Sequence, residues 1–445
     1  MLAPPPLLKT VWASLLIALR ALVCVRWRGV GMLAGVLVVC GCAGPRLMPT
    51  PNAYRETATN PFAAVPVVFR TNTVDLLYVT DRELGTDDGL PAYTYRRSPS
   101  LAFGSCVVGI GDDESWDTLV AESRQARRHT ALPLRLRWVK EQGRFPATPM
   151  ALTRTHAGYA LDGRVAMRLE LTSEALEREL KRRLALTPRK EAFVFVHGFN
   201  NDFGWAAFVA AQVWHFLPRQ GVPILYSWPA GRGGLRGYTY DRESGEFTVY
   251  HLRQLLRALI ECPELEKIHI IAHSRGTDVA TTAVRELVLE DRLSGELVRR
   301  VPKIANLVLI APDLDLQVTA QRFAADFVPL AVGRLTVYVC EKDRAVNLAN
   351  WLFEGVRRLG QVRVHDFTDE QKRYMRAANS VQFIDARVKV DFLGHGYFHD
   401  NPAVSSDLLQ LLREDCDAGE DDCRPLKREQ DVFWKITDDY LAPPR

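Results

Sequence analysis

The second half of the chain alternates between two hydrophobic patterns. Short apolar runs are followed by longer segments in which apolar residues recur every three or four positions, and these patterns predict strands and amphipathic helices respectively. Strands are predicted at 193–197, 223–227, 268–272, 306–311, 335–340 and 383–391, and helices at 204–217, 247–261, 276–290, 317–327 and 346–358. Runs such as 307–310 are wholly apolar, as strands buried on both faces require. The alternation predicts an α/β fold, with a mostly parallel sheet and helices on both faces.

The first half of the chain has a weaker pattern. Strands or hairpin arms are predicted at 73–80, 101–110, 132–139 and 159–171. The last two are expected to form an extra hairpin ahead of the main sheet. Residues 84–100 are rich in Gly, Asp, Pro, Tyr and Ser and predict a loop. Leucines spaced by four predict a helix over 173–184, with Ser173 as its N-cap.

The N-terminus has the pattern of an export signal. Basic residues end at Arg28, and the apolar stretch 29–41 that follows is short for a bilayer span. Gly41 and Cys42 then resemble the box around the acylated cysteine of bacterial lipoproteins. We therefore expect a signal peptide over 1–41 and diacylation of Cys42, which anchors durably because more than one acyl chain inserts. An uncleaved N-terminal anchor is the alternative.

The segment after the signal and the net charge extend this picture. Residues 42–70 contain several prolines and predict an extended tether. Ala43, rather than Asp, follows the acylated cysteine, so we expect a lipid-anchored protein of the cell envelope, at the outer membrane and facing the periplasm. Residues 1–41 carry four basic and no acidic side chains, which accounts for the net charge of +4. The remaining chain is near neutral and gives no basis for nucleic-acid binding.

The chain has 8 cysteines. Two leave with the signal and Cys42 is expected to be acylated, so an odd number remains and at least one thiol stays free. Cys416 and Cys423 are close enough in the sequence to form a disulfide in an oxidising periplasm. No cysteine or histidine group has the spacing of zinc ligands, and we expect neither a metal nor a cofactor.

The segment 268–276 joins an apolar strand to a tight turn around Ser274. Ala272 and Gly276 flank the serine at the two positions where a sharp strand-to-helix turn has no room for a side chain. The pattern is G-x-S-x-G with alanine in place of the first glycine. Such a turn lifts the hydroxyl above the carboxyl edge of the sheet, which favours Ser274 as a nucleophile over an ordinary helix cap.

A nucleophilic serine needs a base and an acid that orients the base. His395 lies between two glycines, as suits an exposed loop histidine, and His399 is its competitor. Asp343 follows a predicted strand, and Asp313, one strand earlier, is the alternative acid. The chain order Ser274, Asp343, His395 is the order that the α/β-hydrolase topology imposes.

The reaction also needs donors for the oxyanion, and the backbone N–H groups of Phe199 and Arg275 are the candidates. Gly198 allows the first of these turns to approach the substrate closely. We interpret His197 and His273 as structural. The Arg275 side chain opposes the macrodipole of the helix that it precedes. It either pairs with a nearby carboxylate, which we favour, or faces an anionic part of the substrate.

Together these motifs resemble the bacterial α/β-hydrolase family long catalogued as a domain of unknown function. The matching segments are LLYVTDR at 76–82, FGSC at 103–106, FVHGFN at 195–200, YSWPAG at 226–231, AHSRG at 272–276, APDLD at 311–315 and GHGY at 394–397. The hydrolase domain is expected over 71–405, followed by a charged C-terminal extension over 406–445. The resemblance implies a serine hydrolase of the esterase or lipase type and leaves the substrate open.

On this basis we expect a membrane-anchored serine hydrolase that acts on a small-molecule or lipid ester. Ser274 attacks the carbonyl, His395 accepts its proton, and Asp343 orients the imidazole, so that an acyl-enzyme forms. One alternative is a non-catalytic envelope lipoprotein that uses the fold as a binding platform. A second is an acyltransferase that passes the acyl group to an alcohol or amine.

Overall fold

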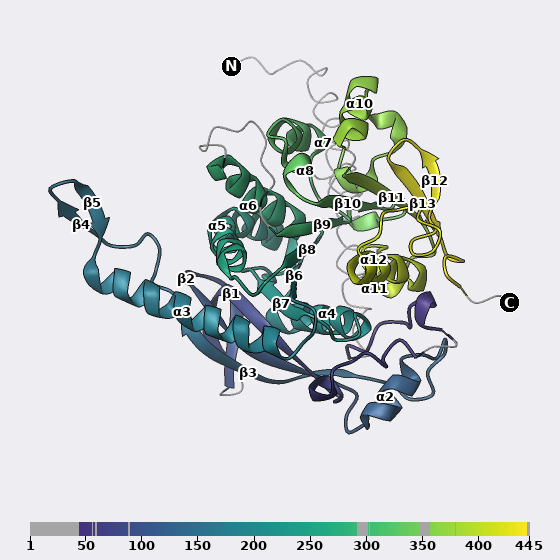
Figure 1. Ribbon diagram of the computed structural model, residues 1–445, viewed down its shortest axis with the longest axis horizontal. Helices are drawn as coiled ribbons and strands as arrows, with labels where there is room; N and C mark the ends of the chain where they lie inside the picture. The colour runs from purple at the N-terminus through teal and green to yellow at the C-terminus, as the bar shows by residue number, and fades with distance from the viewer. Residues whose placement is uncertain are drawn as a thin grey trace, which may run out of the picture. The chain divides into compact units, whose positions relative to one another are not determined.

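A mostly parallel sheet lies at the centre of the fold (Figure 1). The computed structural model describes residues 44–55, 57, 60–87, 90–291, 301, 303–346, 357–378 and 380–442. Within this part of the chain, the sheet has 11 strands in the order β12-β13-β11-β10-β9-β8-β6-β7-β1-β2-β3. Pairing is parallel from β1 across to β13, and antiparallel at both edges, in β1–β2, β2–β3 and β12–β13.

The parallel strands confirm the predicted architecture. The sheet consists of β1 (Thr73–Asp87), β2 (Leu90–Ile110), β3 (Leu134–Arg144), β6 (Glu191–Val196), β7 (Val222–Ser227), β8 (Lys267–His273), β9 (Ile304–Ile310), β10 (Arg334–Val339), β11 (Val381–Arg387), β12 (Lys427–Gln430) and β13 (Phe433–Thr437). Strands β6 to β11 match the six predicted segments to within a few residues. Their register pairs Val196 with Ala272, and Ala272 with Leu309. The loops that follow these strands therefore meet at one edge of the sheet.

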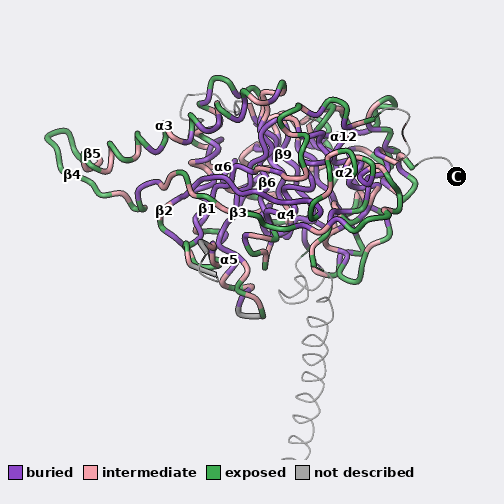
Figure 2. The backbone as a smooth tube through the Cα atoms, turned by 90° about the horizontal axis from the view of Figure 1, so that it is seen from below, coloured by how far each residue is buried: buried purple, intermediate pink, exposed green. Residues whose placement is uncertain are grey.

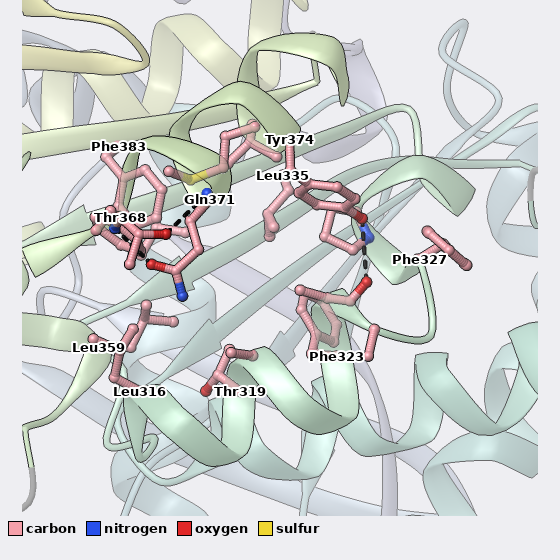
Figure 3. Close-up of a pocket in the computed structure, with 18 of the residues that line it drawn as sticks. Leu316, Thr319, Phe323, Phe327, Leu335, Leu359, Thr368, Gln371, Tyr374 and Phe383 are labelled. Atoms are coloured by element: carbon pink, nitrogen blue, oxygen red, sulfur yellow. Dashed lines mark hydrogen bonds between the residues drawn. The ribbon is translucent and has the colours of Figure 1, made fainter.

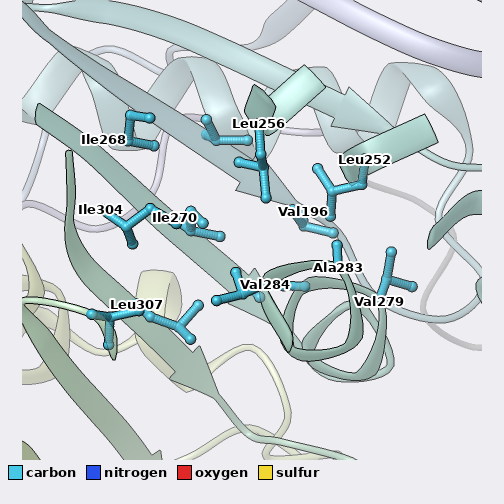
Figure 4. Packing of buried hydrophobic residues seen from close by; sticks show 14 of the residues in the cluster. Val196, Leu252, Leu256, Ile268, Ile270, Val279, Ala283, Val284, Ile304 and Leu307 are labelled. Atoms are coloured by element: carbon cyan, nitrogen blue, oxygen red, sulfur yellow. The ribbon is translucent and has the colours of Figure 1, made fainter. Parts of the chain in front are cut away.

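Alternate side chains of the parallel strands enter two separate hydrophobic clusters. Val194 and Val196 pack with residues of α5 and α6 on one face, as Figure 4 shows for Val196, while Phe193 and Phe195 pack with α4 and α12 on the other. The first face is covered by α3 (Gly163–Ala185), α5 (Gly234–Glu261) and α6 (Gly276–Asp291), and the second by α4 (Phe203–Phe216), α11 (Tyr397–Asp400) and α12 (Pro402–Glu414). Burial on both faces explains why these strands are continuously apolar.

The predicted helix at 317–327 is broken in the structure. This region consists of α7 (Leu316–Thr319), the π-helical segment η4 (Ala320–Ala324) and α8 (Val328–Ala331), and it packs beside α10 (Asp369–Ala378). Phe327 has a left-handed backbone, with φ of 58°, which ends the regular helix. The predicted helix at 346–358 lies almost entirely outside the described residues.

The predicted loop at 84–100 is wrong. Strands β1 and β2 extend through it as one long hairpin, because Arg82 pairs with Arg97 and Leu84 with Tyr93 across the strands. The predicted hairpin of 132–139 with 159–171 is also wrong, since β3 pairs with β2, and β5 (Gly158–Leu161) pairs with β4 (Leu152–Thr155). Helix α3 begins ten residues before the predicted Ser173 cap, because Asp162 accepts hydrogen bonds from the first turn. The exposed β4–β5 hairpin lies at the far end of α3, away from the sheet (Figures 1 and 2).

The segment expected as an extended tether instead packs on the domain from residue 46 onward. Leu47, Met48, Tyr54 and Phe62 are buried in the same cluster as α4 and α12, and the Asn52 amide donates to the carbonyl of Tyr440. The short elements here are η1 (Asn52–Tyr54), η2 (Val67–Phe69) and α2 (Trp116–Glu122). The prediction of an extended segment rested on its proline content alone. The apolar residues between the prolines instead pack against the domain and are buried there.

The predicted extension 406–445 is part of the domain. Helix α12 spans the expected boundary, and β13 pairs with β11. A disulfide joins Cys416 and Cys423, whereas Cys106, Cys262 and Cys340 are free and buried. The remaining short helices are η5 (Leu359–Gln361) and η6 (Val364–Asp366).

The expected signal peptide over 1–41 and the acylated Cys42 lie outside the described residues. Residues 1–45 and 46–445 are separate units. Within the described part of the chain, every helix is too short or too polar to cross a bilayer.

Candidate active site

Ser274 lies in the turn between β8 and α6 with a left-handed backbone, at φ of 52°. This conformation is costly for a residue with a side chain and is held here by neighbouring backbone, because the Ser274 N–H donates to the carbonyl of Ile310 at 2.9 Å. A Cβ on Gly276 would lie 2.2 Å from the carbonyl oxygen of His197. The small residue after the serine is therefore required by the close approach of the turn that follows β6.

That neighbouring turn, 197–201, carries the first predicted oxyanion donor. A Cβ on Gly198 would lie 2.7 Å from the Cβ of Ser274, so only glycine allows the two turns to meet. Asn200, at φ of 55°, donates its N–H to Asp241 at 2.9 Å and reverses the chain. Within the described residues, the N–H groups of Phe199 and Arg275 donate to no protein acceptor. Two unused donors thus flank the serine, as an oxyanion site requires.

Asp343 and His395 form a hydrogen-bonded pair at the same edge of the sheet. Nδ1 of His395 lies 2.7 Å from Oδ2 of Asp343, whose other oxygen accepts the N–H groups of Ala345 and Val346 at 3.0 and 3.1 Å. Asp343 is fully buried, whereas the His395 side chain is 22% exposed. Burial alone would lower the pKa of His395, but the Asp343 carboxylate outweighs it, and the pKa is raised.

His273, the residue before the serine, holds the His395 loop next to the turn. Its Nε2–H donates to the carbonyl of His395 at 3.1 Å, and the two imidazole rings lie 4.7 Å apart. Burial and the neighbouring His395 lower the pKa of His273 well below its usual value, so that it stays neutral. The Ser274 hydroxyl has no hydrogen-bond partner among the described residues, and catalytic contacts of this kind often tighten only when substrate binds.

The two alternatives weighed from the sequence have other partners. Asp313 accepts a hydrogen bond from the hydroxyl of Tyr238 at 2.8 Å and lies 3.5 Å from the guanidinium of Arg358. His399 contacts Asp400, its neighbour in the chain, at 2.9 Å. The structure thus brings Asp343 and His395 together and leaves Asp313 and His399 outside this pair.

The Arg275 side chain pairs with Asp278, one turn along α6, at 2.6 Å. Burial lowers the pKa of Arg275, but Asp278 and Asp313 together outweigh it and raise the pKa. The ion pair offsets the unfavourable position of a cation at a helix N-terminus. This is the first of the two roles expected for Arg275.

Arg82 and the environment of His197 were missed by sequence reasoning. Arg82 is fully buried, and its Nη1 and Nη2 donate to the carbonyls of Ala230 and Asn201 respectively, at 2.7 Å each. Nη2 also contacts Nε2 of His197 at 3.2 Å. Burial and the Arg82 charge lower the pKa of His197 to about 3, so Nε2 accepts while Nδ1–H donates to the carbonyl of Gly198. Arg82 thereby ties the oxyanion turn to β1. In the sequence, Arg82 stood out only as the last residue of the LLYVTDR segment, two positions after the predicted strand 73–80.

Residues 172–414 match the family model described as an alpha/beta hydrolase of unknown function. Among solved structures, an uncharacterized protein from Bacillus cereus is 14% identical over 57% of this chain and 69% of its own, with a TM-score of 0.32. An esterase from Pyrococcus furiosus is 12% identical over 44% of this chain and 74% of its own, with a TM-score of 0.25. A lipase-esterase related protein from Clostridium acetobutylicum is 9% identical over 51% of this chain and 95% of its own, with a TM-score of 0.26. No curated protein matches this sequence.

Proposed function

The chain belongs to the family of alpha/beta hydrolases of unknown function, and on that premise we propose that it is a serine hydrolase that cleaves carboxylic esters. Ser274 is the nucleophile, His395 the general base and Asp343 the acid that orients the base. The observation that carries the proposal is the pair of Asp343 and His395, joined at 2.7 Å, on a loop that His273 fixes beside the strained serine turn.

The geometry supports the following mechanism. Asp343 accepts the Nδ1–H of His395, which leaves the Nε2 lone pair free to take the proton of Ser274 as its oxygen attacks the ester carbonyl. The N–H groups of Phe199 and Arg275 stabilise the negative oxygen of the tetrahedral intermediate. When the intermediate collapses, the C–O bond to the alcohol breaks and His395 returns the proton to the departing oxygen. Water then hydrolyses the acyl-enzyme by the same steps and regenerates Ser274.

The decisive experiment is labelling of the full-length chain, purified in detergent, with a fluorophosphonate probe. We expect the wild type and Ser173→Ala, a variant of an exposed serine on α3, to be labelled, and Ser274→Ala and His395→Ala to remain unlabelled. Thermal unfolding of each variant shows that it is folded. A folded wild type that does not react would contradict the proposal and favour the binding-platform function instead.

Hydrolysis and acyl transfer share the acyl-enzyme and differ only in what resolves it. Product analysis with an ester substrate in the presence of an added alcohol separates the two. We expect free acid as the main product, and predominant transfer to the alcohol would instead identify an acyltransferase.

We also propose that Cys42 carries the lipid that anchors the protein in the outer membrane. The support is the pattern of basic residues, a short apolar stretch and a small residue before the cysteine. Cells fed an alkynyl fatty acid should label the wild type and Cys40→Ser, its nearest matched control, but not Cys42→Ser. Equal labelling of all three chains would rule Cys42 out as the acylated residue.

A further inference from the structure

An apolar pocket lies against the first face of the sheet, between the sheet and the segments α7, η4 and α10 (Figure 3). Its volume is about 480 Å³, which falls in the range of small-molecule binding pockets. Strand residues of one face, among them Leu309, Val337 and Phe383, form its floor. Figure 3 places Leu316 and Leu359 at one end and Phe327 at the other.

Several polar groups of the lining have partners inside the protein. The backbone N–H of Thr368 donates to the side-chain oxygen of Gln371 at 2.8 Å. The backbone N–H of Gln371 in turn donates to the Thr368 hydroxyl at 3.2 Å. The Tyr374 hydroxyl donates to the carbonyl of Ala324 at 3.2 Å. Among the described lining residues, Glu370 is the one that is charged at neutral pH, and it is exposed. The described lining therefore favours an apolar ligand, since a buried charge would find no charged partner there.

The backbone around the pocket departs from regular helix. η4 has π-helical turns, which occur often at functional sites, and Phe327 is left-handed although it is aromatic. Protein interiors are close-packed and seldom leave apolar spaces of this size. The irregular turns keep the side chains of this helical segment from closing onto the floor.

The pocket begins close to the serine turn. Leu309 of its floor is the register partner of Ala272, two residues before Ser274. A strand spacing of about 4.8 Å and a rise of about 3.3 Å per residue place the two Cα atoms, of Leu309 and Ser274, roughly 8 Å apart. At the near end, Leu359 donates its N–H to Leu314 and Gly360 to Pro312, in the segment that crosses beside Ser274.

We propose that this pocket binds the unbranched hydrocarbon chain of the substrate, so that the enzyme acts on esters of long-chain fatty acids. The inference rests on the proposed function for the position of the carbonyl at Ser274. The proposal places the hydrocarbon chain of the substrate against Leu309, Val337 and Phe383 on the pocket floor. It excludes substrates with a charged acyl group. Each further methylene should raise kcat/KM about fourfold until the pocket is full, the factor that corresponds to about 0.8 kcal/mol per buried CH₂.

The test fills the pocket from η4. Ala320 lines it, whereas its neighbour Gln321 is exposed and does not, so Ala320→Trp and Gln321→Trp form a matched pair. Two measurements are made on the full-length chain: fluorescence titration with cis-parinaric acid in the Ser274→Ala background, and kcat/KM for p-nitrophenyl esters from acetate to laurate. Ala320→Trp should weaken parinaric acid binding about tenfold, roughly the loss of two methylene contacts, and remove the preference for laurate while acetate turnover persists. Gln321→Trp should behave as the parent.

Binding and catalysis fail separately in this design. Absence of fluorophosphonate labelling together with intact parinaric acid binding would overturn the proposed function but not the apolar site. Equal parinaric acid binding by Ala320→Trp and its parent, or no binding by the parent, would overturn the pocket assignment. Thr319→Phe fills the pocket from a second position, and the same comparison applies to it if Ala320→Trp unfolds at a lower temperature.

Discussion

Two aspartate–histidine pairs in this molecule have nearly the same geometry and very different surroundings. Nδ1 of His395 lies 2.7 Å from Asp343, and Nδ1 of His251 lies 2.8 Å from Asp81. Both carboxylates are fully buried, but the His395 side chain is 22% exposed and the His251 side chain 2%. One pair lies beside a strained serine turn, and the other joins Asp81, in the middle of β1, to α5.

An aspartate–histidine pair alone does not make an active site. Oδ1 of Asp343, the carboxylate oxygen that does not contact His395, accepts hydrogen bonds from two backbone N–H groups. The corresponding Oδ1 of Asp81 has no partner among the described residues. The ring of His251 packs against Phe247 and Tyr250, so its second nitrogen has little access to a substrate. A partly exposed imidazole, unused backbone donors and the neighbouring Ser274, the proposed nucleophile, are what distinguish the pair of Asp343 and His395.

The largest expected effect comes from converting each carboxylate to an amide. Asp343→Asn should lower kcat about 10⁴-fold, because the amide no longer holds the imidazole tautomer that accepts the serine proton. Asp81→Asn should leave kcat unchanged and lower the free energy of unfolding by about 3 kcal/mol, as expected when one partner of a buried hydrogen-bonded pair is replaced. Ester hydrolysis and urea unfolding of both variants measure the contrast. Comparable losses of kcat in the two variants would abolish the distinction between the pairs.

Gly198→Ala tests the turn next to Ser274 and leaves Asp343 and His395 unchanged. The new Cβ would lie 2.7 Å from the Cβ of Ser274, so the oxyanion turn must move away from the serine. A displacement of about 1 Å costs on the order of 10²-fold in rate, and we expect that loss in kcat with KM little changed. Gly204→Ala, where the nearest atom would be 3.6 Å away, is the matched control and should retain activity.

These sites also show what the sequence could predict. The tight turn at Ser274 could be predicted because it needs small residues next to the serine, and that pattern is local. The sequence favoured Asp343 and kept Asp313 as the alternative, because each follows one of two adjacent parallel strands and both reach the same edge of the sheet. Only the path of the loop to His395, and the contact of Asp313 with Tyr238, decide between them.

The antiparallel flank was harder to predict for a different physical reason. Strands buried on both faces are uniformly apolar, whereas the β1–β2 hairpin extends past the sheet and carries Gly, Pro and charged residues that are typical of loops. Residues 46–70 show the same problem, because their prolines indicated a tether while Leu47 and Tyr54 are buried. Arg82 was missed because its function is to satisfy backbone carbonyls that only the folded chain brings together.

The pH dependence sharpens the comparison with a smaller effect. His395 must be neutral to accept a proton, and Asp343 raises its pKa above the ordinary value of about 6.5. kcat/KM should therefore fall about tenfold per pH unit below a midpoint that lies above 6.5, and reach a plateau at higher pH. Asp343→Asn should move the midpoint to lower pH, because the carboxylate that favours the imidazolium is gone. A midpoint that does not respond to this substitution would show that another group controls the profile.

The smallest expected effect concerns Thr148, whose hydroxyl lies 3.4 Å from Nε2 of His251 and completes a sequence of groups that superficially resembles a triad. That hydroxyl has one proton, and the carbonyl of Pro99 at 3.1 Å is the nearer acceptor. A nucleophile must pass its proton to the base, and here the proton is directed elsewhere, whereas the Ser274 hydroxyl has no competing acceptor among the described residues. Thr148→Val should thus leave kcat and fluorophosphonate labelling unchanged, and lower the free energy of unfolding by about 1 kcal/mol, the value of one hydrogen bond. Residual ester hydrolysis by Ser274→Ala that disappears when Thr148→Val is added would contradict this account and give the second pair a chemical role.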